Sequence, residues 1–145
     1  MNIDLVGAGY KSLLENLIER DFTINAMAIS LSDFLEYFEG KNKKDDNNYF
    51  SGQLFDPLQG RTDLKAGILR VTGEEVFQRD PLRLLRAVRQ SATLGLLIEN
   101  RTRELIRQQA RLICRSSTER IRDELFRILA LNNACFWVVQ LDELG

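Results

Sequence analysis

The spacing of apolar residues changes at Gly73, and this change limits the possible folds more than any other feature of the chain. Before Gly73, apolar residues stand in short runs bounded by turn residues, such as Ile68–Val71, a pattern typical of strands. After Gly73 they recur every three or four positions, which is typical of amphipathic helices. The sequence therefore predicts an α+β fold with two regions, a small sheet within 1–73 and an antiparallel helical bundle within 74–145.

In the first region, Met27–Leu31 is predicted to be a strand on which Leu54-Phe55 pairs back. Between them, the stretch 40–53 is rich in Asn, Asp and Lys and is predicted to be a surface loop or insertion. Asp56–Gly60 has the residues of a turn, and Leu64–Gly67 is expected to form one helical turn.

The second region is predicted to contain four helices. The first begins with Asp80 as N-cap and Pro81 at the first helical position, and it ends at Gly95. The second spans about 102–114, and the third begins with a capping box formed by Ser116 and Glu119. The positions expected to face inward are Leu82, Leu85, Val88 and Ala92 in the first helix, Leu105, Ile106, Ala110 and Ile113 in the second, Ile121, Leu125, Ile128 and Leu129 in the third, and Phe136, Val139 and Trp137 in the fourth.

Composition excludes several classes of site. The chain has no histidine, which rules out Ser-His-Asp and Cys-His catalysis and zinc sites with imidazole ligands. Its two cysteines, Cys114 and Cys135, are too few for a thiolate zinc site or a disulfide framework. We expect them to be buried, reduced thiols of a cytoplasmic protein. No apolar run approaches the roughly 18 residues that a membrane span needs.

The charge is unevenly distributed along the chain. The overall charge of −1 combines −5 in residues 1–78, +7 in residues 79–122 and −3 in residues 123–145. All the basic residues of the middle block are Arg, which suits bidentate contact with phosphate or base edges. Either this block binds a polyanion such as a nucleotide or RNA, or it is a solvated helix face with internal ion pairs.

Three short motifs could carry chemistry. The first, Arg20–Ala28, places a base, a carboxylate and an amide beside an apolar run, and it could either lock a turn or hold a ligand. The second is Asp80-Pro81-x-Arg83. In the third, Asp56–Leu64, two acids flank a glycine turn, and an Asx turn with a helix cap is favoured over a metal site.

The second motif fits the pairing edge of particular nucleobases. Asp80 and Arg83 are one helical turn apart, and an Asp accepts hydrogen bonds whereas an Arg donates them. Adenine and cytosine each present an amine donor next to a ring acceptor, which complements this pair. Guanine and uracil present the reverse order and would leave buried polar groups unpaired, at about 1–3 kcal/mol each. The alternative is that Asp80 only caps the helix while Arg83 is solvated.

In this order, the three motifs together with Glu119–Leu125 resemble the class II tRNA nucleotidyltransferase and bacterial poly(A) polymerase family. The family pattern is Arg-Arg-Asp-Phe-Thr-Ile-Asn-Ala, then Asp-Pro-x-x-Gly-x-x-Asp-Leu, then Glu-Asp-Pro-x-Arg-x-Leu-Arg-Ala-x-Arg, then a Glu-Arg-Ile helix start. The match covers about residues 12–130. Here Glu19 replaces the first Arg of the first motif, and Arg79 replaces the acid before Asp80.

The resemblance implies template-independent addition of C or A to RNA 3′ ends, including the tRNA CCA end, with ATP and CTP as substrates. It implies the C-terminal part of a nucleotidyltransferase head, within 1–73, followed by a helical neck, within 74–145. The nucleotide-binding candidates are Arg20, Asp21, Asn25, Asp80, Arg83 and Arg86. The candidates for structural roles are Asp56, Gly60 and Asp63 in a hinge-like motif, and Glu119 and Arg120 in a motif that stabilises the base-reading helix.

The family also needs two carboxylates, spaced Asp-x-Asp after a Gly-rich turn, to hold Mg²⁺. No Asp-x-Asp occurs in this sequence, so we assign no catalytic or metal-binding residue and expect a family member truncated at its N-terminus. Such a chain would select bases but would be inactive alone. The alternatives are one half of a split enzyme completed by a second chain, a non-catalytic module that binds RNA or nucleotides, and a remnant without function.

Overall fold

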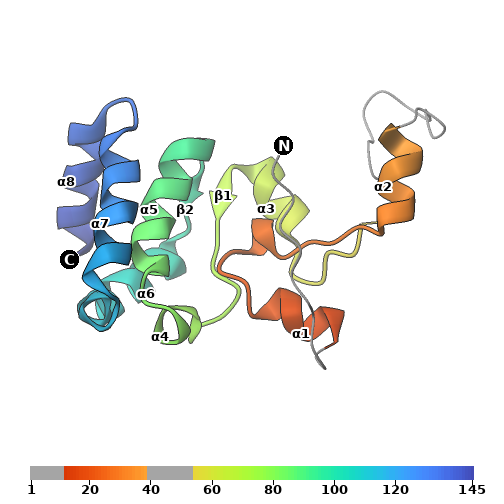
Figure 1. The fold of residues 1–145 in the computed structure, drawn as a ribbon, viewed down its shortest axis with the longest axis horizontal. Coiled ribbons are helices and arrows are strands. Elements are labelled where there is room, and N and C mark those ends of the chain that lie inside the picture. The colour runs from red at the N-terminus through yellow and green to blue at the C-terminus, as the bar shows by residue number, and fades with distance from the viewer. Residues whose placement is uncertain (1–11, 39–53) are drawn as a thin grey trace.

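The computed structural model describes residues 12–38 and 54–145, so the predicted insertion at 40–53 lies outside the described residues. Within the described ranges the fold is mostly helical, with one small sheet of two parallel strands. Figure 1 shows the later helices α5, α7 and α8 side by side at one end of the long axis, with α1, α2 and α3 toward the other. The expected α+β class is confirmed, whereas the antiparallel arrangement of the bundle stays a prediction.

The first described helix, α1 (Leu13–Ile18), begins at a capping box in which Ser12 and Glu15 bond each other's backbone amides. The chain then forms a 3-10 turn, η1 (Thr23–Asn25). The residue before it, Phe22, pairs with Val71 in an isolated antiparallel bridge. The polar side chains of the first motif, Arg20, Asp21 and Asn25, come from this turn and the residues just before it.

The predicted strand at Met27–Leu31 is wrong. Only one bridge, between Ala28 and Phe55, forms there, and Leu31 already begins helix α2 (Leu31–Phe38). The expected pairing of Phe55 back on this segment is nevertheless present. The helix forms because Ser30 accepts a hydrogen bond from the Asp33 amide and so satisfies a free N–H of the first turn.

Helix α3 (Gly60–Ala66) is longer than the predicted single turn because Asp56 caps it. The two carboxylate oxygens of Asp56 accept from the amides of Gly60, at 2.7 Å, and Arg61, at 2.9 Å. A β-carbon at Gly60 would stand 2.1 Å from the carbonyl oxygen of Thr23, so only glycine permits α3 to pack on η1. The predicted turn and cap at Asp56 are thus confirmed.

The sheet consists of β1 (Ile68–Leu69) and β2 (Leu97–Ile98), of which only the first was predicted. Parallel strands need a crossover, and helices α4 (Val76–Arg79) and α5 (Arg83–Leu94) supply it. Gly95, at φ 66°, ends α5 as expected. Regular helix begins only at Arg83, two residues after Pro81, while the Asp80 carboxylate accepts from the Leu82 amide at 3.3 Å.

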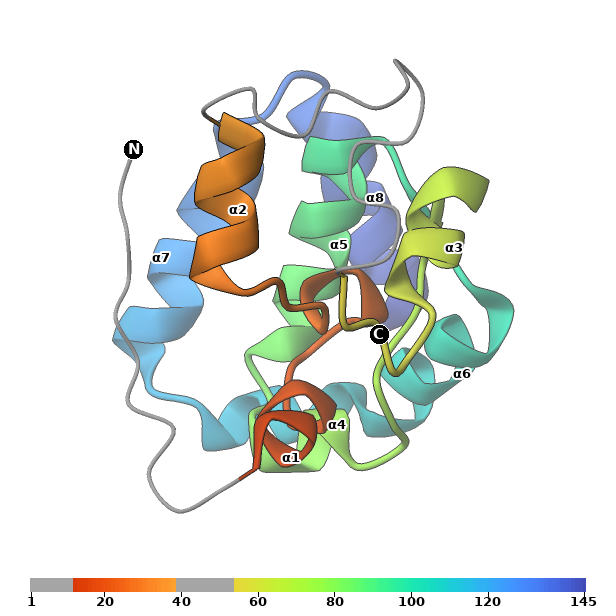
Figure 2. The same cartoon turned by 90° about the vertical axis from the view of Figure 1, so that its right-hand side faces the viewer.

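The remaining chain forms α6 (Asn100–Gln109), a 3-10 segment η2 (Ala110–Arg115), α7 (Thr118–Leu129) and α8 (Ala134–Leu144). The N-cap of α7 is Ser117, not the predicted Ser116, and it accepts from the Arg120 amide. In Figures 1 and 2, α1, α4 and residues 110–115 lie along the lower side of the molecule.

One hydrophobic cluster joins both predicted regions, because Phe22 and Leu69 pack with Phe77, Val88 and Leu105. The division at residue 73 stays a prediction, because residues from both predicted regions share this core. Several predictions of burial are wrong. The residues expected to be buried that are exposed are Leu129, Phe136, Val139, Cys114 and Cys135.

Trp137 and Leu141 are the residues of α8 that pack partly on the core, together with buried Leu144. Of the residues of α8 expected to face inward, Trp137 packs on the core, whereas Phe136 and Val139 are exposed. Within the described ranges, no helix has the length and hydropathy required to span a bilayer.

Candidate functional site

The six residues singled out for ligand binding line one polar cleft of about 500 Å³. They come from three places in the fold: the segment that runs from the end of α1 through η1, the α4–α5 junction, and α5 itself. Helix α5 contributes a seventh residue, Gln90. The lining residues are Arg20, Asp21, Asn25, Asp80, Arg83, Arg86 and Gln90. Three guanidinium groups against two carboxylates give this cleft a net positive charge, which suits an anionic ligand.

Asp21 is the buried anchor of the cleft, with 6% of its surface exposed. Its Oδ2 pairs with Nη2 of Arg86 at 2.8 Å, and its Oδ1 accepts from the Asn25 amide at 2.9 Å and the Phe22 backbone N–H at 3.0 Å. A carboxylate in this setting is committed to the protein, because its charge and most of its lone pairs are already satisfied. Asp21 therefore positions Arg86 and Asn25.

Asn25 and Gln90 form a second pair in the cleft. The Asn25 Nδ2 donates to Asp21 and also to Oε1 of Gln90, at 2.9 and 3.1 Å. Both amide hydrogens of Asn25 are therefore used, and its Oδ1 is left as an acceptor. Gln90 was missed among the sequence candidates, although its spacing of seven from Arg83 and four from Arg86 places it on the same helix face.

Asp80 is held from the opposite side by helix α7. Its Oδ2 pairs with Nη2 of Arg120 at 3.0 Å, and its Oδ1 accepts from the Leu82 amide. Within the described residues, each oxygen thus makes one hydrogen bond and retains a lone pair for a further donor. The pairing joins residues 40 apart in the chain, and it fixes where the carboxylate points.

Arg83 is anchored by backbone oxygens. Its Nη2 donates to the carbonyl of Glu19 at 2.9 Å, and its Nη1 lies 3.5 Å from the carbonyls of Arg20 and Val76. Burial lowers the pKa of Arg83, while the charges of Asp21 and Asp80 act in the opposite direction. The group stays cationic, and a guanidinium has five N–H donors, so donors remain for a ligand.

Arg20 lies at the open rim of the cleft. Its Nη2 donates to Oδ1 of Asn16 at 3.0 Å, and its own backbone carbonyl accepts from the Thr72 hydroxyl at 2.6 Å. The side chain is exposed and, among the residues that the structure describes, is held by Asn16 alone, whereas its backbone carbonyl is bonded to Thr72. Arg20 can therefore turn toward an anion in the cleft without breaking a buried contact.

The third motif stands outside the cleft and supports it. Asp63, which is 6% exposed, accepts from the Thr23 hydroxyl at 2.7 Å and from Arg70 at 3.0 Å. Arg70 also pairs with Glu99 at 3.0 Å and so ties α3 to the start of α6. The hydrogen bonds that Arg70 donates to Asp63 raise the pKa of Arg70. Sequence reasoning missed Arg70 and Glu99, since no local pattern marks a contact across 29 residues.

The fourth motif, Glu119–Leu125, contains both exposed and buried groups. Glu119 is exposed on α7, whereas Glu124 on the same helix is 4% exposed and pairs with Arg89 of α5 and, at 3.6 Å, with Arg127. Helix α7 is therefore linked to α5 by the pair Glu124–Arg89, and to the α4–α5 junction by the pair Arg120–Asp80. These links hold the helix that carries the cleft residues.

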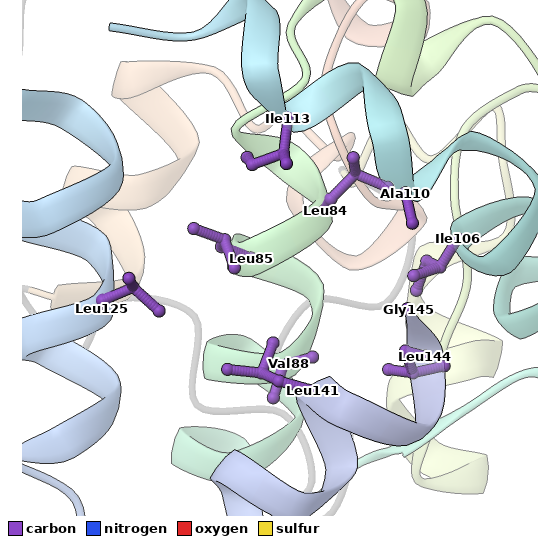
Figure 3. A pocket seen from close by; sticks show the side chains of 10 residues that line it. All are labelled: Leu84, Leu85, Val88, Ile106, Ala110, Ile113, Leu125, Leu141, Leu144 and Gly145. Carbon is purple, nitrogen blue, oxygen red and sulfur yellow. The ribbon is translucent and has the colours of Figure 1, made fainter. Parts of the chain in front are cut away.

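A second cavity, of about 200 Å³, lies between the helices of the bundle. Figure 3 shows that aliphatic side chains surround it, among them Leu85, Leu125 and Leu141. It offers no side-chain hydrogen-bonding group, so it cannot orient a polar ligand. The polar cleft is therefore the candidate site.

The described residues do not fit the metal that the family resemblance implies. Within residues 12–38 and 54–145, no three His, Cys, Asp or Glu side chains gather in a group that could hold a metal ion. Asp21 and Asp80, the two carboxylates of the cleft, are each engaged by an arginine. We therefore assign no step of a reaction to a metal on this chain.

Two family models match the chain. Residues 5–70 match the poly A polymerase head domain, and residues 95–145 match the probable RNA and SrmB-binding site of polymerase A. Among curated proteins, the chain is 37% identical over 134 residues to a CC-adding tRNA nucleotidyltransferase of Geobacter sulfurreducens, covering 92% of this chain and 27% of that protein. It is 34% identical to an A-adding tRNA nucleotidyltransferase of Deinococcus radiodurans, covering 92% and 28%.

The fold of the chain is also similar to solved structures of CCA-adding enzymes. A CCA-adding enzyme with CTP matches with a TM-score of 0.74 and 33% identity, over 90% of this chain and 28% of that one. The Thermotoga maritima CCA-adding enzyme complexed with tRNA-CCA matches with the same TM-score and identity, over 91% and 29%. The chain thus spans about a quarter to a third of the length of the proteins it matches.

Proposed function

The chain belongs to the tRNA nucleotidyltransferase and poly(A) polymerase family, and we propose that it is the part that selects the incoming nucleotide for addition of C or A to an RNA 3′ end. The observation that carries this proposal is the convergence of Arg20, Asp21, Asn25, Asp80, Arg83 and Arg86 on one cleft. ATP and CTP are the proposed ligands, and the tRNA 3′ end is the proposed acceptor. We place this function in the cytoplasm.

The hydrogen-bond acceptors and donors that Asp80 and Arg83 have left support base selection. Asp80 keeps acceptor capacity toward the exocyclic amine of adenine or cytosine, and Arg83 keeps N–H donors toward the neighbouring ring nitrogen. Guanine and uracil would set a carbonyl against the carboxylate and an N–H against the guanidinium. Each unpaired group costs about 1–3 kcal/mol, which corresponds to roughly 5- to 150-fold in affinity.

The other cleft residues suit the sugar and the phosphates. The free Oδ1 of Asn25 can accept from a ribose hydroxyl, because both of its amide hydrogens are bonded to Asp21 and Gln90. Arg20 and Arg86 supply positive charge, and Arg86 retains donors beyond the one that pairs with Asp21. Base and phosphate groups of one nucleotide would thus meet different arginines.

Equilibrium binding of the four ribonucleoside triphosphates to the 145-residue chain tests base selection. We expect CTP and ATP to bind about 5- to 150-fold more tightly than UTP and GTP, and Asp80→Ala to bring the four affinities together. Arg83→Ala should weaken all four and also reduce the discrimination. Asp123→Ala is the matched control, since Asp123 is an exposed acid whose one ion pair within residues 12–38 and 54–145 is with its neighbour Arg122. Unchanged preferences in Asp80→Ala would contradict the assignment.

The chain could instead be a non-catalytic module rather than the base-selecting part of an enzyme. This alternative is favoured by the lack of an Asp-x-Asp in the sequence. Incubation of the chain with tRNA, CTP, ATP and Mg²⁺ should give no nucleotide addition. Addition restored by mixing with a chain that carries the two carboxylates would support a split enzyme. Addition by this chain alone would contradict our conclusion that it has no pair of catalytic carboxylates.

A further inference from the structure

The cleft holds two side-chain amides that base selection does not use. Asn25 comes from η1 and is exposed, whereas Gln90 comes from the later part of α5 and is 9% exposed. The Asn25 Nδ2 donates to Oε1 of Gln90 at 3.1 Å, across 65 residues of sequence. We call Asn25 and Gln90 the amide pair. Both residues line the cleft, so the atoms that this bond leaves over can contact a ligand.

The orientation of both amides follows from the carboxylate of Asp21. An ionised carboxylate accepts hydrogen bonds and cannot donate them, so the Asn25 group that lies 2.9 Å from its Oδ1 must be the NH₂. The second hydrogen of that NH₂ then needs an acceptor, which is Oε1 of Gln90. Asp21 thereby fixes which way the Asn25 amide points, and Asn25 fixes the direction of the Gln90 amide.

The two groups that remain have opposite polarity. Within residues 12–38 and 54–145, Oδ1 of Asn25 and Nε2 of Gln90 have no hydrogen-bond partner. The Gln90 Nε2 is accessible to solvent, although most of that side chain is buried. The amide pair therefore presents one acceptor and one donor to the cleft, and the bond between the two amides holds them in place.

From this polarity we infer that the amide pair binds the two neighbouring hydroxyls of a ribose, and that Gln90 is a further specificity-determining residue of the cleft. The inference rests on the proposed function, which brings a nucleoside triphosphate to the cleft. A hydroxyl both donates and accepts, so one ribose hydroxyl donates to Oδ1 of Asn25 while the other accepts from Nε2 of Gln90. A sugar that lacks either hydroxyl leaves one member of the amide pair without a partner.

The position of the amide pair along α5 fits a sugar. Gln90 lies seven residues beyond Arg83, or about 10 Å along the helix axis. This span is comparable to a nucleoside measured from the pairing edge of its base to its ribose hydroxyls, with a hydrogen bond at each end. A base bound at Asp80 and Arg83 would therefore bring its ribose to the amide pair. Because both amides are uncharged, the phosphates are left to the arginines of the cleft.

Equilibrium binding of CTP, 2′-deoxy-CTP and 3′-deoxy-CTP to the 145-residue chain tests the inference. Removal of either hydroxyl should weaken binding about 2- to 13-fold, the range for one hydrogen bond between neutral groups. Gln90→Met keeps the length of the side chain but has no N–H. It should weaken CTP binding by a similar factor. It should also reduce the penalty for one of the two deoxy analogues to below about twofold, because the hydroxyl which that analogue lacks no longer has a donor.

The matched control is Gln108→Met, because Gln108 is exposed on α6 and its side chain has no hydrogen-bond partner among the described residues. It should leave all three affinities within about twofold. A Gln90→Met variant that weakens CTP and both deoxy analogues by the same factor would overturn the inference, since a merely structural role gives such a uniform loss. Penalties below about twofold for both analogues in the unsubstituted chain would also overturn it.

Nuclear magnetic resonance of the unsubstituted chain gives a second measurement that needs no variant. At saturation, the side-chain amide resonances of Gln90 should shift more with CTP than with 2′,3′-dideoxy-CTP, because only CTP has hydroxyls for Nε2 to contact. Equal shifts with the two nucleotides would contradict this contact.

Comparison of CTP with UTP separates this inference from base selection. Gln90→Met should keep the preference for CTP over UTP, because Asp80 and Arg83 are unchanged. If the unsubstituted chain binds CTP and UTP equally but Gln90→Met removes a deoxy penalty, base selection fails and the role of the amide pair stands. If the unsubstituted chain prefers CTP over UTP but binds both deoxy analogues as tightly as CTP, the role of the amide pair fails and base selection stands.

Discussion

Replacement of Arg86 by Gln should destabilise the chain by about 2 kcal/mol. Asp21 would lose its only ion pair in the described structure while staying buried, and two of its three hydrogen bonds would remain. A unit charge pair about 4 Å apart is worth about 4 kcal/mol at an effective dielectric constant of 20. Because the Arg86 side chain is 37% exposed, solvent screening reduces this by about half. The net figure corresponds to a fall in melting temperature of about 6–8 °C.

Thermal and urea unfolding, followed by circular dichroism, measure this loss. The matched control is Arg122→Gln, whose pair with Asp123 is exposed on both sides at 59% and 61% and should contribute less than about 0.5 kcal/mol. A double-mutant cycle with Asp21→Asn should give a coupling energy above about 1 kcal/mol. An Arg86→Gln variant as stable as Arg122→Gln, or an additive cycle, would refute the reasoning that Asp21 depends on Arg86.

Three further results follow from the structure. Gly60→Ala should cost more than about 2 kcal/mol in urea unfolding, because its methyl would overlap the Thr23 carbonyl, whereas Gly73→Ala, with nothing within 4 Å, should be nearly neutral. Arg70→Met should cost about 1–2 kcal/mol, because it leaves Asp63 buried with only a hydroxyl partner; equal stability would contradict this role. The free energy of unfolding should vary by less than about 1 kcal/mol between pH 6 and 9. The chain has no histidine, and the raised pKa of Arg70 means that its contribution is complete below its unfolded pKa and is lost only as pH rises through the folded value, far above this range.

The sequence predicted those elements whose determinants are local. The cap at Asp56 and the end of α5 at Gly95 follow from short-range hydrogen bonding and from backbone conformation. The strand expected at Met27–Leu31 failed because an apolar run of that length is equally compatible with the start of a helix, and Ser30 decided the outcome. Strand β2 has only two residues, too few for a periodic signal.

The candidate site was predictable as a set of residues but not as an arrangement. Motif order and spacing brought Asp21 and Asp80 into view, but their partners, Arg86 and Arg120, lie 65 and 40 residues further along the chain. Such pairings depend on how α5 and α7 pack, which no local pattern encodes. The burial of Phe136 was predicted wrongly for a related reason, since periodicity does not reveal which face of a helix has a neighbour.

The most direct test of the central claim is the coupling between the Asp80 carboxylate and the exocyclic amine of the base. The measurement compares ATP with purine riboside triphosphate, which lacks that amine, for the unsubstituted chain and for Asp80→Ala. We predict that loss of the amine weakens binding about 5- to 150-fold in the unsubstituted chain and less than about twofold in Asp80→Ala. The same ratio in both proteins would contradict base reading by Asp80.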